Sequence, residues 1–206
     1  MKIIFIGMSN SGKTYWSKKL KKEKGFLYFG CDDFIQKKLN LKSIEDLSNW
    51  LGLPHEKKYI KNSQIYLRYE EEATKTAINL LKKEENKNIV IDTTGSIVHL
   101  PLKYLQDLSR LGIIIYLKIP EKEVKKMIQL YFTHPKPVIW GNFFKKKKDD
   151  HNPIEKIKKS YPQLLSYRQK VYQKFAHLVL DCLQLRNSNY TSDDFLEIIK
   201  KNAKIS

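Results

Sequence analysis

The chain has 206 residues, of which 41% are hydrophobic and 30% charged, and its formal net charge is +17. This length and apolar content allow one well-buried core, so we expect a single domain over residues 1–206. The longest N-terminal apolar run, "IIFIG", is too short for a signal-peptide core, and the two cysteines lack metal-ligand spacing. These features argue against a disulfide framework and a membrane span, and they predict a cytoplasmic protein, which we expect to be a monomer.

All but four of the 39 basic residues are lysines, spread along almost the whole chain. Dispersed lysine is typical of a solvated surface, although a basic chain can also attract nucleic acid or an acidic membrane surface. We expect no specific nucleic-acid partner, because the sequence shows no recognised base-reading motif.

The N-terminal stretch "MKIIFIGMSNSGKTYWSKKL" predicts a buried strand, a loop and a helix. Residues 7–14 read G-x-x-x-x-G-K-T, the pattern of a phosphate-binding loop; a chance glycine-rich turn is the alternative. The glycines allow positive φ, so successive backbone N–H groups can point at one anion beside the helix N-terminus. Lys13 would reach the β- and γ-phosphates of ATP, and Thr14 would hold Mg²⁺. The expected ATP-binding residues are Gly7, Ser9, Asn10, Ser11, Gly12, Lys13 and Thr14.

Strand-like and helix-like segments alternate along the rest of the chain. We expect helices over about 13–24, 33–40, 43–52, 56–83, 101–112, 121–132 and 160–176, and a last one after "TSDD". Strands are expected at "KIIFI", "FLYFG", "NIVID", "IIIYLKIP" and "HLVLD". The alternation predicts an α/β fold in which a mostly parallel sheet of about five strands has helices on both faces. Its ligands should bind at the carboxyl ends of the strands.

Residues 134–152, "HPKPVIWGNFFKKKKDDHN", interrupt this pattern without any sustained periodicity. Long irregular segments in a domain are usually functional or disordered. Trp140, Phe143 and Phe144 would be unusual as exposed residues of a plain linker, so we interpret the segment as a candidate lid over the substrates.

Arg168 falls within an apolar stripe of the helix expected over 160–176, together with Leu164, Leu165 and Tyr172. A buried guanidinium needs an anionic partner, because an unpaired buried charge is costly. The partner could be an acidic side chain in a structural ion pair, or the carboxylate or phosphate of a substrate.

Other polar residues allow a structural and a functional interpretation. Arg68 and Glu71, three residues apart on the long helix, can form a plain surface pair or part of a site. Asp32 and its neighbour Asp33 follow the second strand, where a carboxylate can cap a helix or accept a proton from an attacking hydroxyl. Asp92 ends the third strand, where it could be simply hydrogen-bonded or could hold a metal ion's water shell.

With these residues in view, the chain resembles the shikimate kinase family, which shares the three-layer P-loop kinase fold of the nucleoside monophosphate kinases. The resemblance covers roughly residues 1–181. "GMSNSGKTYWSKKL" is similar to the family's ATP loop, "FGCDDFI" to its acidic segment, "LRYEE" to its Phe-Arg-x-x-Glu pattern, and "YRQKVYQKFAHLVLD" to its late Arg-x-x-x-Tyr helix. The resemblance implies that Asp32 contacts the substrate, that Arg68 and Arg168 bind its carboxylate, and that ATP and Mg²⁺ are the cofactors.

Three positions depart from the family pattern. Thr94, Gly95 and Ser96 stand where the family has three glycines, which leaves Gly95 as the close backbone approach to the substrate. Gly30 replaces a metal-associated aspartate, so Asp92 or Asp33 would take that role beside Thr14. Lys136 replaces the lid arginine, keeping its charge without the planar fork.

We therefore expect an ATP-dependent kinase that phosphorylates a hydroxyl of a small carboxylated metabolite, with shikimate, converted to shikimate 3-phosphate, as first candidate. Lys13, Asp32 and Lys136 are the expected catalytic residues. A nucleoside or nucleotide kinase, with Trp140 or Tyr69 stacking a base, is one alternative. A nucleotide-binding module without turnover is another.

Overall fold

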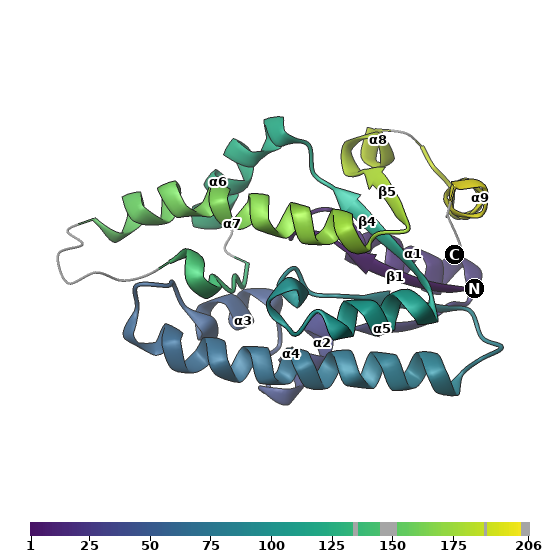
Figure 1. Ribbon diagram of the computed structural model, residues 1–206, viewed down its shortest axis with the longest axis horizontal. Coiled ribbons are helices and arrows are strands. Elements are labelled where there is room, and N and C mark those ends of the chain that lie inside the picture. The colour runs from purple at the N-terminus through teal and green to yellow at the C-terminus, as the bar shows by residue number, and fades with distance from the viewer. Residues whose placement is uncertain (134–135, 145–151, 188, 203–206) are drawn as a thin grey trace.

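The computed structural model describes residues 1–133, 136–144, 152–187 and 189–202, and a five-stranded sheet runs through its centre (Figure 1). The strands are β1 (Lys2–Ile6), β2 (Leu27–Gly30), β3 (Ile89–Asp92), β4 (Ile113–Lys118) and β5 (Leu178–Asp181). Their order in the sheet is β2-β3-β1-β4-β5, and every neighbouring pair is parallel. This topology confirms the expected α/β fold.

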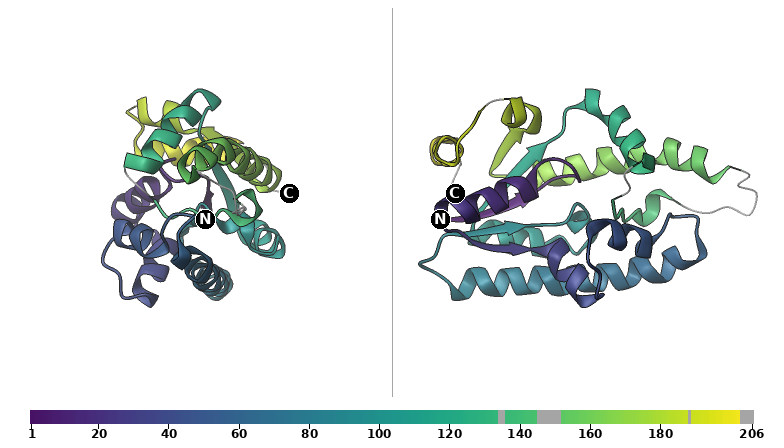
Figure 2. Two further views of the ribbon diagram at one scale, coloured as in Figure 1. Left: turned by 90° about the vertical axis from the view of Figure 1, so that its left-hand side faces the viewer. Right: turned by 180° about the vertical axis from the view of Figure 1, so that it is seen from behind.

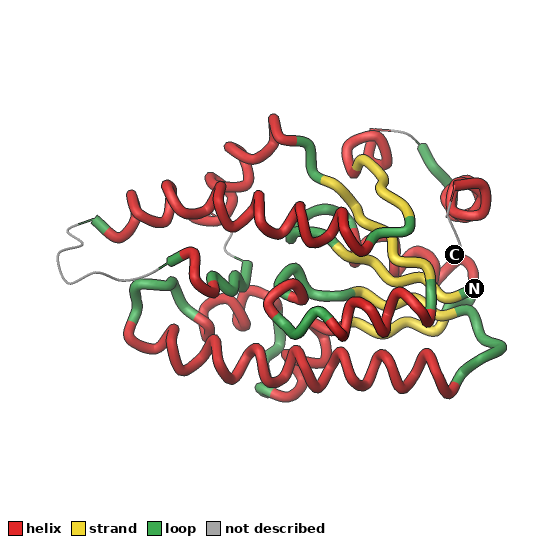
Figure 3. Tube along the Cα trace, in the orientation of Figure 1, coloured by secondary structure: helices red, strands yellow, loops and turns green. Residues whose placement is uncertain are grey.

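Helices cover both faces of the sheet, as Figures 2 and 3 show. One face packs against α4 (Lys57–Lys83), α5 (Lys103–Leu111) and α7 (Pro153–Phe175), and the other against α1 (Lys13–Lys24), α8 (Cys182–Asn187) and α9 (Ser192–Asn202). The remaining helices are α2 (Cys31–Lys38), α3 (Ile44–Leu51) and α6 (Val124–Thr133), with short 3₁₀ turns η1 (Ile97–His99), η2 (Glu121–Glu123) and η3 (Gly141–Phe143). None of the helices that the structure describes has the length and apolarity needed to cross a bilayer.

Alternation along the strands divides the core into two parts. Ile4 and Ile6 of β1 face the larger cluster under α4, α5 and α7, whereas Ile3 and Phe5 face the smaller cluster under α1 and α9. Successive side chains of a strand point to opposite faces, so a strand buried on both sides is apolar throughout. Because the strands themselves are apolar, the polar residues lie just beyond the strand ends. The candidate site residues are found there.

Two helices differ from the sequence predictions. α7 begins at Pro153 instead of about residue 160, because the Asn152 side chain accepts a 3.1 Å hydrogen bond from the Glu155 N–H and proline fits the first helical turn. The short helix α8 was not expected, since its six residues are too few to show a helical period.

The structure describes residues 136–144 and 152 of the candidate lid, of which Val138, Ile139 and Trp140 are buried. Residues 134–135 and 145–151 lie outside the described part. Trp140 is fully buried, and Phe143 and Phe144 are half-buried, so these aromatic side chains are not the exposed residues of a plain linker. The Tyr59 hydroxyl bonds to the backbone of this segment: it accepts a 2.8 Å hydrogen bond from the Trp140 N–H and donates a 3.1 Å bond to the Val138 carbonyl.

Candidate active site

The loop between β1 and α1 has the backbone conformation that binding a phosphate requires. Gly7 and Gly12 have φ values of 145° and 95°, and Asn10 between them has a φ of 63°. A Cβ atom on Gly7 would also lie 2.9 Å from the Leu117 carbonyl oxygen, so this position needs glycine for both conformation and space. The curled loop ends at the N-terminus of α1, where free N–H groups favour an anion.

Lys13, the first residue of α1, is buried at the base of this loop. Its Nζ donates a 3.1 Å hydrogen bond to the Met8 carbonyl, and it forms no ion pair with any described carboxylate. Burial lowers the pKa of Lys13, while the nearby charges of Asp92 and Asp32 raise it. A phosphate bound in the loop would supply the close anionic partner that the ammonium group lacks.

Thr14 and Asp92 form the pair expected for a metal site. The Thr14 hydroxyl donates a 2.6 Å hydrogen bond to Asp92 Oδ2, while the buried Asp92 Oδ1 has no described hydrogen-bond partner. Burial raises the pKa of Asp92, and Lys13 and Thr14 oppose that shift. No group of three or more potential ligands occurs among the described residues. A hydroxyl and one carboxylate suit Mg²⁺, which takes its other ligands from nucleotide phosphates and water.

A cleft of about 920 Å³ opens beside the loop, along the carboxyl ends of β1, β2 and β3. Asp32, Tyr66, Gly95 and Lys136 line it together with the loop residues from Ser9 to Thr14. The structure thus brings all three predicted catalytic residues, Lys13, Asp32 and Lys136, to one cavity.

Asp32 lies in the first turn of α2, on the wall of this cleft. One of its oxygens, Oδ1, accepts a 3.2 Å hydrogen bond from the Tyr66 hydroxyl. Burial, followed by the charge of Asp92, raises the pKa of Asp32 to about 6, against the opposing effects of Lys13 and Tyr66. Asp33 has a different environment, because it is exposed and its Oδ2 accepts a 2.8 Å hydrogen bond from Tyr28. Asp32 is therefore the carboxylate placed to receive a proton near neutral pH.

Helix α4 presents Tyr66 to the cleft, whereas Arg68 and Glu71 do not line it. Arg68 is exposed, and its guanidinium lies 5.2 Å from the ring centre of Tyr69, so the structure does not bring it to the cleft. Glu71 forms an ion pair of 2.8 Å with Lys75 on the outer face of the same helix. Arg68 and Tyr66 are two residues apart and therefore point in nearly opposite directions from the helix, which places Arg68 outside this cleft. The assignment of Arg68 to substrate binding stays a prediction.

Glu70 is a buried acid that the sequence did not single out, with only 1% of its surface exposed. It accepts hydrogen bonds from the hydroxyls of Thr94 and Ser96, which follow β3 on either side of Gly95. Burial raises the pKa of Glu70 to about 7, whereas the two hydroxyls lower it. Thr94 and Ser96, the departures from the triple glycine, therefore support a buried carboxylate behind the cleft.

Arg168 on α7 is buried, as the apolar stripe predicted. Its Nη2 donates a 2.8 Å hydrogen bond to the Ile139 carbonyl, and its Nε has no hydrogen-bond partner in the described part of the chain. No described carboxylate lies within ion-pair distance of the guanidinium. A Cβ atom built on Gly95 would lie 3.4 Å from Arg168 Nη1, so the guanidinium lies just behind this backbone position.

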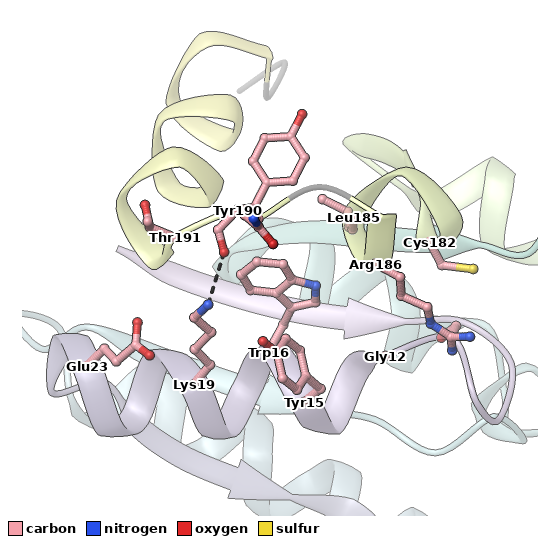
Figure 4. A pocket seen from close by; sticks show the side chains of 12 residues that line it. Gly12, Tyr15, Trp16, Lys19, Glu23, Cys182, Leu185, Arg186, Tyr190 and Thr191 are labelled. Atoms are coloured by element: carbon pink, nitrogen blue, oxygen red, sulfur yellow. Dashed lines mark hydrogen bonds between the residues drawn. The ribbon is translucent and has the colours of Figure 1, made fainter.

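A second cavity, of about 720 Å³, adjoins the loop on the opposite side of α1 and is shown in Figure 4. It lies between α1, α8 and the start of α9, and Lys19 Nζ donates a 3.0 Å hydrogen bond to the Tyr190 carbonyl across it. Arg186 of α8 lines both cavities and donates a hydrogen bond to the Asn10 carbonyl within the loop. Arg186 could not be recognised as a site residue from the sequence, because the six-residue helix α8 has no detectable period.

Sequence comparisons show that the chain is similar to shikimate kinases. No family model matches the chain. A shikimate kinase of Clostridium botulinum strain Loch Maree is 29% identical over 207 residues, covering 98% of this chain and 96% of the relative. The chloroplastic shikimate kinase 1 of Arabidopsis thaliana is 26% identical over 137 residues, covering 65% of this chain and 38% of the relative.

Solved structures show the same fold. The shikimate kinase of Acinetobacter baumannii, solved in complex with shikimate, aligns with a TM-score of 0.63 at 20% identity and covers 99% of this chain and 95% of its own. The Aquifex aeolicus shikimate kinase aligns with a TM-score of 0.60 at 18% identity and covers 98% of this chain and 95% of its own. The resemblance of the chain to shikimate kinases and its P-loop kinase fold are thereby confirmed.

Proposed function

We propose that the chain is an ATP-dependent kinase that transfers a phosphoryl group to a hydroxyl of a small carboxylated metabolite, with shikimate as first candidate acceptor. The observation that carries the proposal is the single cleft that joins the phosphate-binding loop, the Thr14–Asp92 pair and Asp32. The similarity to shikimate kinases over nearly the whole chain supports the same chemistry.

The loop would hold the triphosphate, and the second cavity would hold the nucleoside part of ATP. Ser11, Gly12, Tyr15 and Arg186 line both cavities, so one nucleotide can extend from the cleft into the neighbouring space. Arg186 would then contact the nucleotide near the loop, where its charge complements the phosphates.

Mg²⁺, held through Thr14 and Asp92, would neutralise charge on the β- and γ-phosphates when bound. Lys13 would contribute positive charge from the base of the loop, and Lys136, which also lines the cleft, would contribute positive charge as well. Phosphoryl transfer depends mainly on positioning and charge, so these groups need only stay fixed around the transferring group.

Asp32 would orient the acceptor hydroxyl and take its proton as the bond to phosphorus forms. Its pKa of about 6 leaves it ionised at neutral pH yet basic enough to accept a proton. Arg168 would attract the carboxylate of the acceptor past Gly95, because the buried guanidinium has no described carboxylate partner.

No observation on the structure favours the nucleoside kinase alternative. Trp140, proposed to stack a base, is fully buried, and Tyr69 lies beside Arg68 away from the cleft. The presence of Lys13, Thr14, Asp92 and Asp32 in one site argues against a module without turnover.

The test is an assay of ADP release with shikimate, gluconate, nucleosides and nucleoside monophosphates as acceptors. We expect release with shikimate or another hydroxy acid, and none in the Lys13→Ala variant. Preference for a nucleoside would favour the second candidate, and no release with any acceptor, despite ATP binding, would favour a module without turnover.

A further inference from the structure

The phosphate-binding loop contains one left-handed residue that is not glycine. Asn10 has a φ of 63°, whereas the other loop residues with positive φ are Gly7 and Gly12. A side chain makes the left-handed conformation less stable than the right-handed or extended ones, although asparagine tolerates it better than most residues. Contacts from outside the loop therefore affect how much of the time Asn10 adopts this conformation.

Arg186 supplies such a contact from the far end of the sequence. Its Nη2 donates a hydrogen bond to the Asn10 carbonyl, across 176 positions of the chain. Figure 4 shows this side chain reaching from α8 toward the loop that ends at Gly12. Among the described residues, no carboxylate lies within ion-pair distance of Arg186, so its guanidinium is not drawn away from the loop by an acidic side chain.

The helix that carries Arg186 is anchored on both sides of its first turn. Asp181 Oδ1 accepts hydrogen bonds of 2.7 and 3.4 Å from the N–H groups of Leu183 and Gln184, which caps the start of α8. Cys182 and Leu185 are buried, and they pack into the two parts of the core. Arg186 therefore projects toward the loop from a fixed helix.

The hydrogen bond to the Asn10 carbonyl also orients the peptide group that follows it. The C=O and N–H of a trans peptide point in opposite directions, so the Ser11 N–H points away from Arg186. This N–H donates a 3.3 Å hydrogen bond to the Met8 carbonyl and closes the turn over residues 8–11. The same carbonyl accepts a 3.1 Å bond from Lys13 Nζ. The conformation of Asn10 thus affects the turn on which Lys13 rests.

We propose that Arg186 is a positioning residue that holds Asn10 in the left-handed conformation and so keeps the loop in the shape that binds phosphate. This inference rests on the proposed function, in which the loop holds the triphosphate of ATP. Removing the hydrogen bond lowers the population of the binding-competent loop, and the apparent affinity for ATP falls by the same factor. The charge of Arg186 can act on the nucleotide as well, so the experiments must separate the two effects.

The first measurement is the affinity of the full chain for ATP with Mg²⁺, by calorimetry. Arg186→Met keeps the apolar stem of the side chain and removes its donors, so we expect the affinity to fall about fivefold. Arg186 is exposed, and its replacement leaves the core intact. Arg110→Met is the matched control, because it removes the same charge from an exposed arginine of α5 that lies outside both cavities. Its affinity should stay within about twofold of wild type.

Asn10→Gly shows whether Arg186 acts through the backbone of the loop. Glycine adopts positive φ without a steric cost, so a loop with glycine at this position no longer needs the hydrogen bond. In the Asn10→Gly background, adding Arg186→Met should therefore weaken ATP binding less than about twofold. A fivefold loss in both backgrounds would overturn the proposal, because it would show that Arg186 acts on the nucleotide through its charge alone.

Hydrogen exchange of the Ser11 amide, measured by NMR in the chain without nucleotide, tests the loop itself. This amide closes the turn, so Arg186→Met should speed its exchange about fivefold, and Arg110→Met should not. In the Asn10→Gly background, Arg186→Met should add almost nothing. Unchanged exchange in Arg186→Met would overturn the proposal even if ATP binding weakens. A wild type that shows the expected exchange but binds no ATP would support the positioning role and contradict only the proposed function.

Discussion

The Thr14 hydroxyl donates a 2.6 Å hydrogen bond to Asp92 Oδ2, although the two residues lie 78 positions apart in the sequence. Their strands, β1 and β3, are parallel neighbours in the sheet, so the loop after one strand and the last residue of the other meet at the same edge. The free Oδ1 of Asp92 and the hydroxyl of Thr14 leave a polar corner beside the phosphate-binding loop. In the proposed function, this corner would hold the metal–nucleotide complex.

The Asp92→Asn variant tests whether Thr14 and Asp92 hold Mg²⁺. The amide keeps the shape of the carboxylate but removes its charge, so we expect kcat to fall about 100-fold or more and the required Mg²⁺ concentration to rise. The measurement is a Mg²⁺ titration of ADP release with a fixed ATP concentration. Asp33→Asn is the matched control, because Asp33 is exposed and bonded to Tyr28. Equal Mg²⁺ curves for wild type and Asp92→Asn would contradict the assignment.

The Arg168→Lys variant tests whether Arg168 binds the carboxylate of the acceptor. Arg68→Lys on α4 is the control. A lysine cannot reproduce the planar fork, and loss of one charge-assisted hydrogen bond costs about 1.5–3 kcal/mol, so the KM for the acceptor should rise roughly ten- to hundredfold. The KM for ATP should hardly change. Arg68→Lys should leave both constants near wild type, because Arg68 is exposed and outside the cleft. A large effect of Arg68→Lys with none from Arg168→Lys would reverse this assignment.

Gly7→Ala tests the loop conformation. Gly7 has a φ of 145° and a Cβ there would lie 2.9 Å from the Leu117 carbonyl oxygen, so alanine should shift the loop and cost about 1–3 kcal/mol of stability. ATP binding, measured by calorimetry, should weaken at least about tenfold. Gly25→Ala is the control: its φ of 67° is also positive, but no atom lies within 4 Å of the added carbon. Weakened ATP binding in Gly25→Ala alone would refute the argument.

The buried carboxylate of Glu70 predicts how stability depends on pH. Its folded-state pKa is about 7 and its ordinary value is 4.5, so the folded state binds more protons between these two pH values. The free energy of unfolding should therefore fall as pH rises from about 4.5 to 7, by roughly 2–3 kcal/mol from this group, and Asp32 acts in the same direction.

Urea unfolding at pH 5 and pH 8 measures this loss. Glu70→Gln should remove the part that comes from Glu70, whereas Glu71→Gln should retain it, since ion pairing and hydrogen bonding lower the pKa of Glu71. The same change in stability between pH 5 and pH 8 in the wild type and in Glu70→Gln would show that Glu70 is ionised throughout.

The loop and Arg168 could be predicted from the sequence because local rules determine them. Glycines at two fixed positions before Lys13 and Thr14 have a direct conformational meaning, and the structure has positive φ at both. Arg168 was found because a charged residue among apolar ones at helical spacing must point inward, and the residue is buried.

The register of α4 could not be predicted in the same way. Three consecutive glutamates, residues 70–72, offer three possible inward positions, and only the packing of α4 against the loop after β3 selects Glu70. The pattern "LRYEE" therefore suggested Arg68 and Glu71 as site residues. In the structure, Tyr66 lines the cleft, and Glu70 lies behind it, hydrogen-bonded to Thr94.

Residues 136–144 show a second limit. Two of them, Val138 and Trp140, form backbone hydrogen bonds with Tyr59, which lies 79 and 81 positions away in the sequence. No periodicity within the segment could reveal such a partner. Arg186 was missed for a related reason, since its place beside Asn10 depends on the return of the chain after β5.

The most direct test of the proposed chemistry is the rate of ADP release by Asp32→Asn with the best acceptor. The asparagine can still accept the Tyr66 hydrogen bond but cannot take the proton of the acceptor hydroxyl. We predict a kcat at least about 100-fold below wild type, with the KM for ATP changed less than about threefold. A kcat within about threefold of wild type would contradict the assignment of Asp32 as the group that accepts the proton.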